Sequence, residues 1–270
     1  LMAPILFFLG IPPSIAVSTE ATQICAASVS GSLAHFRRGN LDIKMGGLLV
    51  AGGLIGSTIG VFTFKWLITL GSVDLVIQLF YVVFLGGVGG LMFLESLQAM
   101  MRRKAGKTVS LKRRHGFMHG LPFRTKFPRS KLYISAILPV TVGFGVGFLS
   151  AIMGVGGGFI MVPAMIYLLG MPTLVVVGTS LFTIIFVTAN NTLQHAWFNG
   201  TVDLVLAGLL LLGGVIGAQI GVRLSGRFNA EQLRILLAII VLAVCFKILM
   251  DLLIGGPAVQ FSFGGGAGHA

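Results

Sequence analysis

Charge is scarce in this sequence and unevenly placed. Charged residues make up 10% of the 270 residues and hydrophobic residues 56%, whereas soluble globular chains carry roughly 25% charged residues. Residues 132–202 contain no Lys, Arg, Asp or Glu at all. A soluble core has no use for so long an uncharged run, but each helix that spans a bilayer needs about 20 predominantly apolar residues. The composition therefore predicts an all-α, polytopic membrane protein.

Patterns of common catalytic and metal sites are also missing. The sequence has no HExxH, no CxxC, no Walker-type phosphate loop and no acyl-transfer triad. We therefore expect no enzymatic activity, no metal and no cofactor, and the sequence does not support an ATP-driven pump or a membrane hydrolase. The two cysteines, Cys25 and Cys245, lie in apolar segments, where a free thiol behaves as a small buried hydrophobe.

The net charge of +12 does not indicate nucleic-acid binding, because of where the basic residues lie. More than half of the 19 Lys and Arg residues fall within 102–131, without an acid among them. Between two hydrophobic halves, clustered Lys and Arg are typical of a cytoplasmic loop, and they can meet anionic lipid headgroups. No folded nucleic-acid-binding module accompanies the charge. We expect residues 101–132 to form a basic cytoplasmic loop.

The remaining sequence contains one module twice. Residues of the first half recur in the same order, 159 to 161 positions later: Pro4 and Pro163, Thr19 and Thr179, His35 and His195, Asp42 and Asp203. GGLIGSTIG, starting at Gly52, matches GGVIGAQIG, starting at Gly213. We expect two homologous repeats, 1–100 and 133–254, followed by a flexible tail, 255–270. The second repeat has a GVGGG cluster ahead of the counterpart of Leu1, so we expect the N-terminal part of the first repeat to precede Leu1.

Hydrophobic runs predict where the chain crosses the membrane. Candidate spans are 14–35, 43–64, 75–94, 133–153, 173–198, 202–224 and 232–254. Segment 159–169 is too short to cross alone, and glycine and proline interrupt the chain on both of its sides. Its counterpart, 1–9, ends at a similar interruption, GIPP from Gly10. We therefore predict broken or re-entrant helices, in the second repeat directly after the glycine-rich loop.

Loop charge predicts that the two repeats lie in opposite orientations. In the first repeat the basic residues gather in the first loop (Arg37, Arg38 and Lys44), and the second loop has only Lys65. In the second repeat the first loop has none, and the second has Arg223, Arg227 and Arg234. Because Lys and Arg favour the cytoplasmic side, this reversal indicates inverted repeats, an arrangement typical of secondary transporters.

Helix ends inside the membrane suggest what such a protein binds. A half-helix leaves its first N–H groups without partners, and those donors carry partial positive charge that favours an anion. We expect Gly156, Gly157 and Gly158 to bring backbone N–H groups to a substrate, unless these glycines serve packing alone. Nearby polar side chains could complete the site: Thr19, Gln23, Thr179, Ser180, Asn190 and Asn191.

Glu20 is an acid in an otherwise uncharged membrane segment. Such a residue is costly and is a functional hypothesis by default, and burial disfavours its ionised form. We therefore predict proton coupling through Glu20, with His35 and His195 as further candidates. The alternatives are a structural acid paired with a neighbouring polar group, and two histidines that are satisfied locally.

Several of these segments together resemble a known family. GVGGGFIMVP, VVVGTSL, NNTLQHAWFNGTVD and GGVIGAQIG in the second half, with LGIPPSIAVST and SLAHFRRGNLDIKMG in the first, are similar to the sulfite exporter TauE/SafE family. The resemblance covers nearly the whole chain outside the basic loop and the tail. It departs from the family pattern where the first GxGGG is missing and where Glu20 replaces the expected hydroxyl, which is Ser180 in the second repeat.

The resemblance implies a permease of the bacterial inner membrane for small anions such as sulfite and organosulfonates. We therefore expect a secondary transporter whose partners are a small anion and membrane lipid, with Glu20 as the reason to expect proton coupling. The competing interpretation is a passive channel for anions or small neutral solutes, and a membrane scaffold is a third. A homodimer is compatible with the sequence, which does not decide the oligomeric state.

Overall fold

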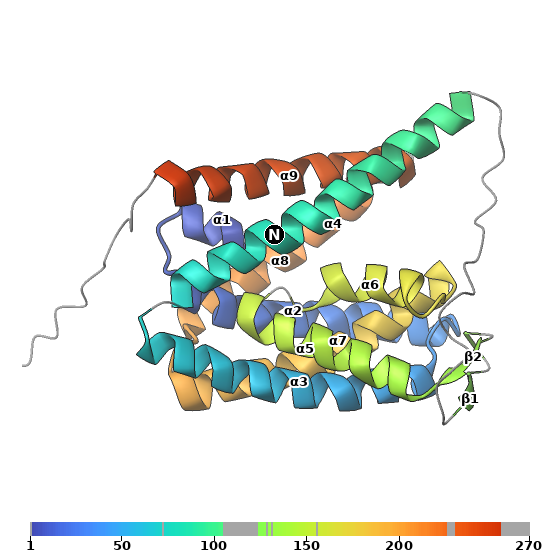
Figure 1. Cartoon of the computed structure of the whole chain (residues 1–270), viewed down its shortest axis with the longest axis horizontal. Helices are drawn as coiled ribbons and strands as arrows, with labels where there is room; N and C mark the ends of the chain where they lie inside the picture. The colour runs from blue at the N-terminus through green and yellow to red at the C-terminus, as the bar shows by residue number, and fades with distance from the viewer. Residues whose placement is uncertain are drawn as a thin grey trace, which may run out of the picture.

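The computed structural model describes residues 2–71, 73–104, 124–127, 129–130, 132–154, 156–225 and 230–254. Most of the predicted basic loop and the predicted tail lie outside these residues. Within them, the elements in chain order are α1 (Met2–Phe8), α2 (Pro13–Arg37), α3 (Ile43–Thr69), α4 (Val73–Lys104), β1 (Arg124–Phe127), β2 (Leu132–Ser135), α5 (Ile137–Met153), α6 (Gly158–Tyr167), α7 (Thr173–Gln194), the π-helix η1 (His195–Asn199), α8 (Leu204–Ser225) and α9 (Ala230–Ile254). Figure 1 shows most of the helices lying side by side along one common direction.

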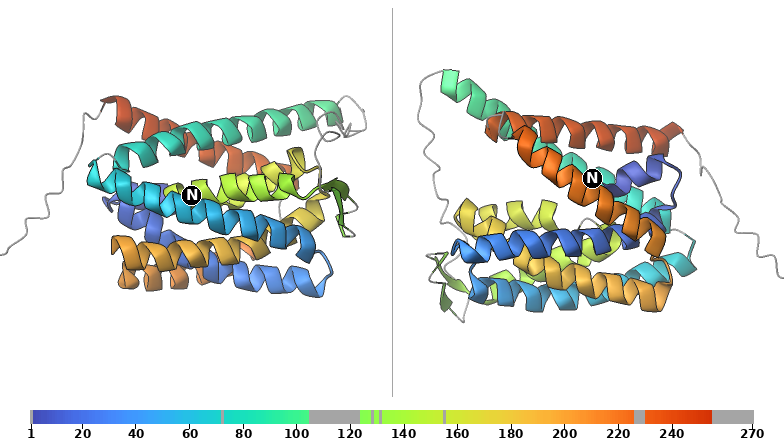
Figure 2. Two further views of the ribbon diagram at one scale, coloured as in Figure 1. Left: turned by 60° about the horizontal axis from the view of Figure 1, so that its bottom comes forward. Right: turned by 180° about the vertical axis from the view of Figure 1, so that it is seen from behind.

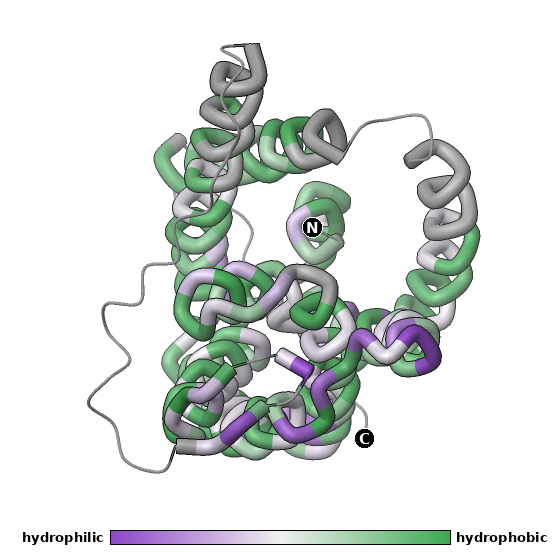
Figure 3. The backbone as a smooth tube through the Cα atoms, turned by 90° about the vertical axis from the view of Figure 1, so that its right-hand side faces the viewer, coloured by the Kyte–Doolittle hydropathy of each residue, from purple (hydrophilic) through white to green (hydrophobic). Residues whose placement is uncertain are grey.

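The helices have the length and composition of a multi-pass membrane protein, as predicted. Among the described residues, four stretches are long and apolar enough to cross a bilayer: Ile43–Thr69, Val73–Leu91, Val175–Asn199 and Ile235–Leu253. Shorter apolar helices cover Ile137–Met153, Gly158–Tyr167 and Leu204–Gly217. Figure 3 views the molecule from its β1–β2 end. Hydrophilic residues gather in the turns at this end, and the residues of the helices behind are mainly hydrophobic.

Helix ends follow the local sequence signals. Gly10 and Gly170 adopt left-handed backbone conformations, with φ of 83° and 70°, and a proline follows each of them before the next helix begins. Asp42 caps α3 by accepting a hydrogen bond from the Met45 N–H at 3.2 Å. Asp203 caps α8 in the same way, accepting from the Leu206 N–H at 3.1 Å. These are the N-terminal caps expected of aspartate.

α3 and α5 pack backbone to backbone through glycines. A Cβ atom added to Gly56 would lie 2.0 Å from the Phe144 carbonyl oxygen, and one added to Gly147 would lie 2.3 Å from the Gly53 carbonyl oxygen. Small residues permit such close approach between membrane helices. The contacts advance together along both helices, so α3 and α5 run parallel.

Two further helix pairs run antiparallel. In the α2–α7 pair, the Cys25 thiol donates to the Ile185 carbonyl oxygen at 3.6 Å, and Gly31 meets the Leu181 side chain. In the α4–α9 pair, the Cys245 thiol donates to the Val82 carbonyl oxygen at 3.4 Å.

α8 (Leu204–Ser225) starts beside α2. Toward its C-terminal end it inclines away from α2 (Figure 2, right).

α5 and α6 form a hairpin that enters and leaves at the same end of the bundle. α5 starts directly after β2, and the chain after α6 packs with Phe127 and Ile134 of the two strands. The turn between the helices lies against Val17 and Ile24 of α2. With 17 and 10 residues, α5 and α6 extend roughly 25 and 15 Å. This is the broken-helix arrangement that the glycine-rich loop predicts.

The β1–β2 hairpin is an element that the sequence analysis did not predict. Its strands pair antiparallel, with Arg124 opposite Ser135. Asp42 binds the turn between them, since one of its carboxylate oxygens accepts from the Ser130 N–H at 3.0 Å and from the Ser130 hydroxyl at 2.6 Å. The hairpin is therefore attached to the loop between α2 and α3.

Candidate functional site

The candidate site is built around the turn between α5 and α6. Gly154, Gly156 and Gly157 have φ values of 67°, 65° and 74°, a left-handed conformation that favours glycine. A Cβ atom at Gly154 would lie 2.4 Å from the Val17 carbonyl oxygen, and one at Gly156 would lie 2.5 Å from Ile24. Both backbone conformation and space therefore require glycine here, which brings this turn against the middle of α2.

Three carbonyl groups at the end of α5 have hydrogen-bond partners. The Ser150 carbonyl oxygen accepts from the Gly154 N–H at 2.9 Å. The Ala151 carbonyl oxygen accepts from His195 Nε2 at 3.1 Å. The hydroxyl of Tyr81 donates to the Met153 carbonyl oxygen. Buried backbone groups in native proteins are almost all paired, and this side of the turn follows that rule.

The N–H groups at the start of α6 are different. Those of Ile160 and Met161 donate to the Gly157 carbonyl oxygen at 3.1 and 2.6 Å. Among the described residues, no acceptor faces the N–H groups of Gly157, Gly158 or Phe159. Gly157 is buried and Gly158 is half-buried. Within the described part of the chain, the first turn of α6 therefore presents unpaired donors inside the molecule, where the helix dipole favours negative charge.

Ser150 and Asn191 lie beside these donors. A Cβ atom at Gly157 would be 3.7 Å from the Ser150 Cβ, and Asn191 Nδ2 donates to the Ser150 hydroxyl at 3.1 Å. Asn191 is 1% exposed, and its Oδ1 has no partner among the described residues. Exchanging the two amide atoms would still leave one of them unpaired. A buried polar atom without a partner is costly, so this side chain is also open to a ligand.

Glu20 lies on the same face of α2 as Val17 and Ile24, the two residues that contact the turn. Residues three or four positions apart lie on one face of a helix. Glu20 is 3% exposed. Its Oε2 accepts a hydrogen bond from the Ala3 N–H at the start of α1, at 2.8 Å. Glu20 therefore lies on the side of α2 whose neighbouring residues, Val17 and Ile24, contact the turn.

Thr19 and Thr179 are not brought together. The Thr179 hydroxyl accepts from the Asp42 N–H at 3.1 Å, near the β1–β2 end. The Thr19 hydroxyl accepts from the Asp203 N–H at 3.2 Å, toward the other end. In the antiparallel α2–α7 pair, the two threonines are separated by about 20 Å along the helices at 1.5 Å per residue. Both hydroxyls join the two halves of the chain.

The other predicted residues have different surroundings. The Ser180 hydroxyl donates to the Val177 carbonyl oxygen at 3.0 Å within α7. Asn190 Nδ2 donates to the Ser57 hydroxyl of α3 at 2.8 Å. Gln23 meets Gly214 of α8, and its Oε1 has no partner among the described residues. His35 packs against Gly178, and its Nδ1 is likewise unpaired within the described chain.

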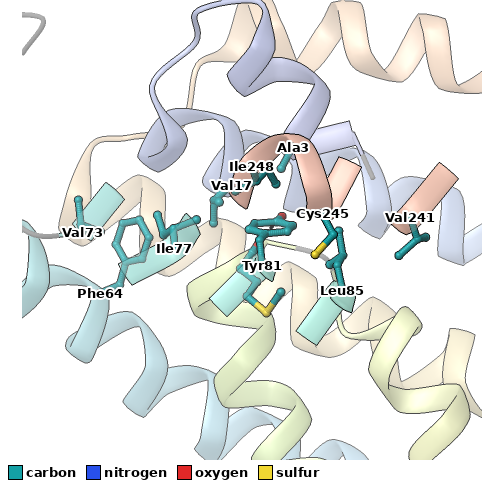
Figure 4. Packing of buried hydrophobic residues seen from close by; sticks show 11 residues of the cluster. Ala3, Val17, Phe64, Val73, Ile77, Tyr81, Leu85, Val241, Cys245 and Ile248 are labelled. Atoms are coloured by element: carbon teal, nitrogen blue, oxygen red, sulfur yellow. Dashed lines mark hydrogen bonds between the residues drawn. The ribbon is translucent and has the colours of Figure 1, made fainter. Parts of the chain in front are cut away.

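Tyr81 and Ser150 are site residues that the sequence reasoning missed. Tyr81 is fully buried, and Figure 4 shows its ring between α2 and α9, close to Val17, Cys245 and Ile248. The sequence offered two signals for them: a lone tyrosine in an apolar span, and a lone serine four residues before the glycine cluster.

Within the described ranges, no group of three His, Cys, Asp or Glu side chains could hold a metal ion.

Comparison with known proteins identifies the family. The model of the family described as sulfite exporter TauE/SafE matches residues 1–248. The probable membrane transporter protein YunE of Bacillus subtilis (strain 168) is 26% identical over 244 residues, which is 90% of this chain and 84% of the relative. YjnA of the same organism, another probable membrane transporter protein, is 24% identical over 268 residues, covering 92% of this chain and 90% of the relative.

A probable membrane transporter protein of Xylella fastidiosa (strain 9a5c) is 27% identical over 248 residues, which is 91% of this chain and 84% of the relative. No solved structure matches the chain. The relatives are transporters by name, the helices are those of a multi-pass membrane protein, and the family model covers nearly the whole sequence. The chain belongs to the sulfite exporter TauE/SafE family.

Proposed function

We propose that this membrane transporter carries a small oxyanion, sulfite or an organosulfonate, and that the anion binds at the first turn of α6. The observation that carries the proposal is the set of N–H groups at the buried Gly157 and the half-buried Gly158 and Phe159, which lack an acceptor among the described residues. Asn191 beside them supports it, because its amide keeps one atom unpaired within the described chain. The family's description as sulfite exporters supports the choice of anion.

The composition of the site favours a singly charged anion, so that sulfite would bind in its protonated form, hydrogensulfite. Residues 132–202 supply no Lys or Arg. The negative charge of the anion would therefore be balanced by N–H groups and the helix dipole, which carry only partial positive charge. Burying a second full charge without a partner is much more costly. Ile24, Val146 and Ile184 pack around the glycines and would suit the apolar substituent of an organosulfonate.

Proton coupling through Glu20 is part of the proposal. Glu20 shares the face of α2 that lies against the turn, and an ionised carboxylate there would repel the anion. The anion would therefore bind better when Glu20 is neutral, which links transport to the proton gradient. His35 and His195 are the alternative carriers.

Inverted repeats at an inner membrane are also proposed. The reciprocal contacts support them: Thr179 accepts from Asp42, and their counterparts Thr19 and Asp203 make the same bond. Such exchange of equivalent partners is typical of two-fold symmetry. Because α2 and α7 run antiparallel, the two-fold axis that relates them would be perpendicular to the helices. The exposed basic residues at the β1–β2 end support a cytoplasmic position for that end: Arg37, Arg38, Lys44, Lys126 and Arg129.

The test is uptake of radiolabelled sulfite by proteoliposomes, with methanesulfonate and sulfate as competitors. We expect saturable uptake that preloaded internal sulfite accelerates, and stronger competition by methanesulfonate than by sulfate. Asn191→Leu should weaken apparent affinity, whereas Thr183→Val, which removes a buried hydroxyl bonded within α7, should not. Uptake without saturation or acceleration would favour the passive channel, and absence of any oxyanion uptake would refute the proposal.

A further inference from the structure

The end of α5 is held by two side chains that come from distant parts of the sequence. His195 belongs to η1 and donates to the Ala151 carbonyl oxygen. Tyr81 belongs to α4 and donates to the Met153 carbonyl oxygen. Both carbonyls lie in the last turn of α5, where intrahelical partners run out. These two bonds therefore fix the backbone directly before the Gly154–Gly157 turn.

Both ring nitrogens of His195 have hydrogen-bond partners. A carbonyl oxygen only accepts, so Nε2 carries the hydrogen toward Ala151. Nδ1 lies 2.9 Å from the side-chain amide of Asn199, which holds the ring from its other side. Phe64 packs edge-on to the ring, with centroids 4.7 Å apart, and the side chain is 1% exposed.

A one-residue insertion accounts for this geometry. The first repeat reads HFRRG from His35, and the second reads HAWFNG from His195. The separation between equivalent positions accordingly rises from 160 at the histidines to 161 at Gly39 and Gly200. The extra residue falls within the π-helix η1, which directly follows α7. Asn199 is brought to His195 by this segment, whereas His35 keeps an unpaired Nδ1 among the described residues.

Tyr81 holds the same helix end from the other side. It is fully buried, and its ring meets Phe7 of α1 edge-on at 5.6 Å between centroids. Its hydroxyl reaches Met153, the last residue of α5. Tyr81 therefore connects the end of α5 to the short helix α1 and to the α4–α9 pair.

We propose that His195 and Tyr81 are positioning residues for anion binding, which hold the end of α5 so that the first N–H groups of α6 meet the anion. The inference rests on the proposed function of the α6 site. Binding sites need their groups held within about 0.5 Å of the productive geometry. Without these two bonds, the Gly154–Gly157 turn loses its anchor on the α5 side, and the N–H groups no longer converge.

The first test compares His195→Ala, His195→Gln and Tyr81→Phe with Thr183→Val. For His195→Ala and Tyr81→Phe we expect sulfite binding to weaken about tenfold, or about 1.4 kcal/mol, with a raised KM and an unchanged maximal rate. His195→Gln should recover most of the affinity, because its amide can still donate to Ala151. It should also keep the pH-gradient dependence of transport, which loss of a proton carrier would remove. Thr183→Val should bind as the wild type does.

The second test measures hydrogen exchange of the amides in residues 154–160 without any anion. Exchange should rise in His195→Ala and Tyr81→Phe and stay unchanged in Thr183→Val. Deleting Ala196, which restores the spacing of the first repeat, should raise it as His195→Ala does.

The two tests separate the possible failures. If the wild type binds no oxyanion, the proposed function fails, and the exchange data still decide whether these side chains hold the turn. Wild-type affinity and wild-type exchange in both variants would refute the positioning role, as would loss of pH-gradient dependence in His195→Gln.

Discussion

At the scale of single residues, the two halves differ at Glu20 in a way that adds a charge. The equivalent Ser180 bonds within its own helix, whereas Glu20 reaches across to α1 and accepts from the Ala3 N–H. A carboxylate is an anion tethered to the chain, so its charge competes with a free anion for the same kind of donor. Replacing a serine by a glutamate thus gives one half a titratable group that the other half lacks at this position.

Glu20→Gln should separate anion exchange from proton coupling. The amide mimics the protonated carboxyl group, so sulfite exchange should persist while an imposed pH difference no longer drives accumulation. The measurement is sulfite flux in proteoliposomes with and without that difference. Glu20→Asp is the matched control, and it should keep part of the coupling because it retains a carboxylate on a shorter side chain. Unchanged gradient dependence in Glu20→Gln would make Glu20 a structural acid and move attention to His35.

The sequence could indicate the polar residues of the site, because polar side chains in a membrane segment must avoid lipid. Asn191 and Glu20 were found in this way, and both lie near the turn. The same reasoning could not separate them from Thr19 or Asn190, whose hydrogen bonds join helices. Tyr81 was missed because its hydroxyl acts on the Met153 carbonyl group, 72 positions away.

At the scale of elements, helix positions were largely predictable, because hydrophobic runs and glycine or proline interruptions mark their ends. The expected 173–198, for example, corresponds to α7 together with η1. The β1–β2 hairpin was not predictable, because it depends on Asp42 binding Ser130 and on burial of Phe127 against α6. The π-helix was also missed, although the change in repeat spacing at Gly200 was a signal for it.

The α3–α5 contact allows a prediction about stability. In Gly56→Ala the new Cβ would overlap the Phe144 carbonyl oxygen, so the two helices must separate, and overpacking of this kind typically costs about 1–3 kcal/mol. We expect a lower melting temperature in detergent than for the wild type. Because α5 leads into the Gly154–Gly157 turn, sulfite affinity should fall as well.

Gly47→Ala is the matched control. Gly47 lies in the same helix, but among the described residues no atom comes within 4 Å of the place that an alanine Cβ would occupy. Alanine also favours a helix over glycine by up to about 1 kcal/mol, so the melting temperature of this variant should equal or exceed that of the wild type. Equal stability of Gly56→Ala and Gly47→Ala would show that the glycine contact does not hold α3 against α5.

At the scale of the whole molecule, two antiparallel pairs and two reciprocal hydrogen bonds relate the halves. α2 pairs with α7 and α4 with α9, which are the helices that the proposed repeat would make equivalent. α8, which the proposed repeat matches with α3, differs from it: among the described residues, no atom lies within 4 Å of the place that a Cβ atom added to Gly213 or Gly217 would occupy. Gly52 and Gly56 of α3 pack against α5. The matching glycines of α8 contact no helix in this way among the described residues.

Cysteine labelling can test whether the repeats are inverted. Arg38 directly follows α2 and Ala196 lies in η1, both shortly after the matched histidines His35 and His195, and both are exposed. In a background with Cys25→Ala and Cys245→Ala, inversion places Arg38→Cys and Ala196→Cys on opposite sides of the membrane. A membrane-impermeant maleimide added to intact cells should label only Ala196→Cys, and Arg38→Cys should react after permeabilisation.

Lys126→Cys in β1 makes this test independent of the orientation of the whole protein. Lys126 is exposed at the same end of the bundle as Arg38, so these two sites should always react together. If both react from outside and Ala196→Cys does not, the repeats are inverted but the basic end faces outward, against the positive-inside rule. If Arg38→Cys and Ala196→Cys react from the same side, the halves are not inverted. The reciprocal bonds of Thr19 and Thr179 would then require a two-fold axis that does not lie in the membrane plane.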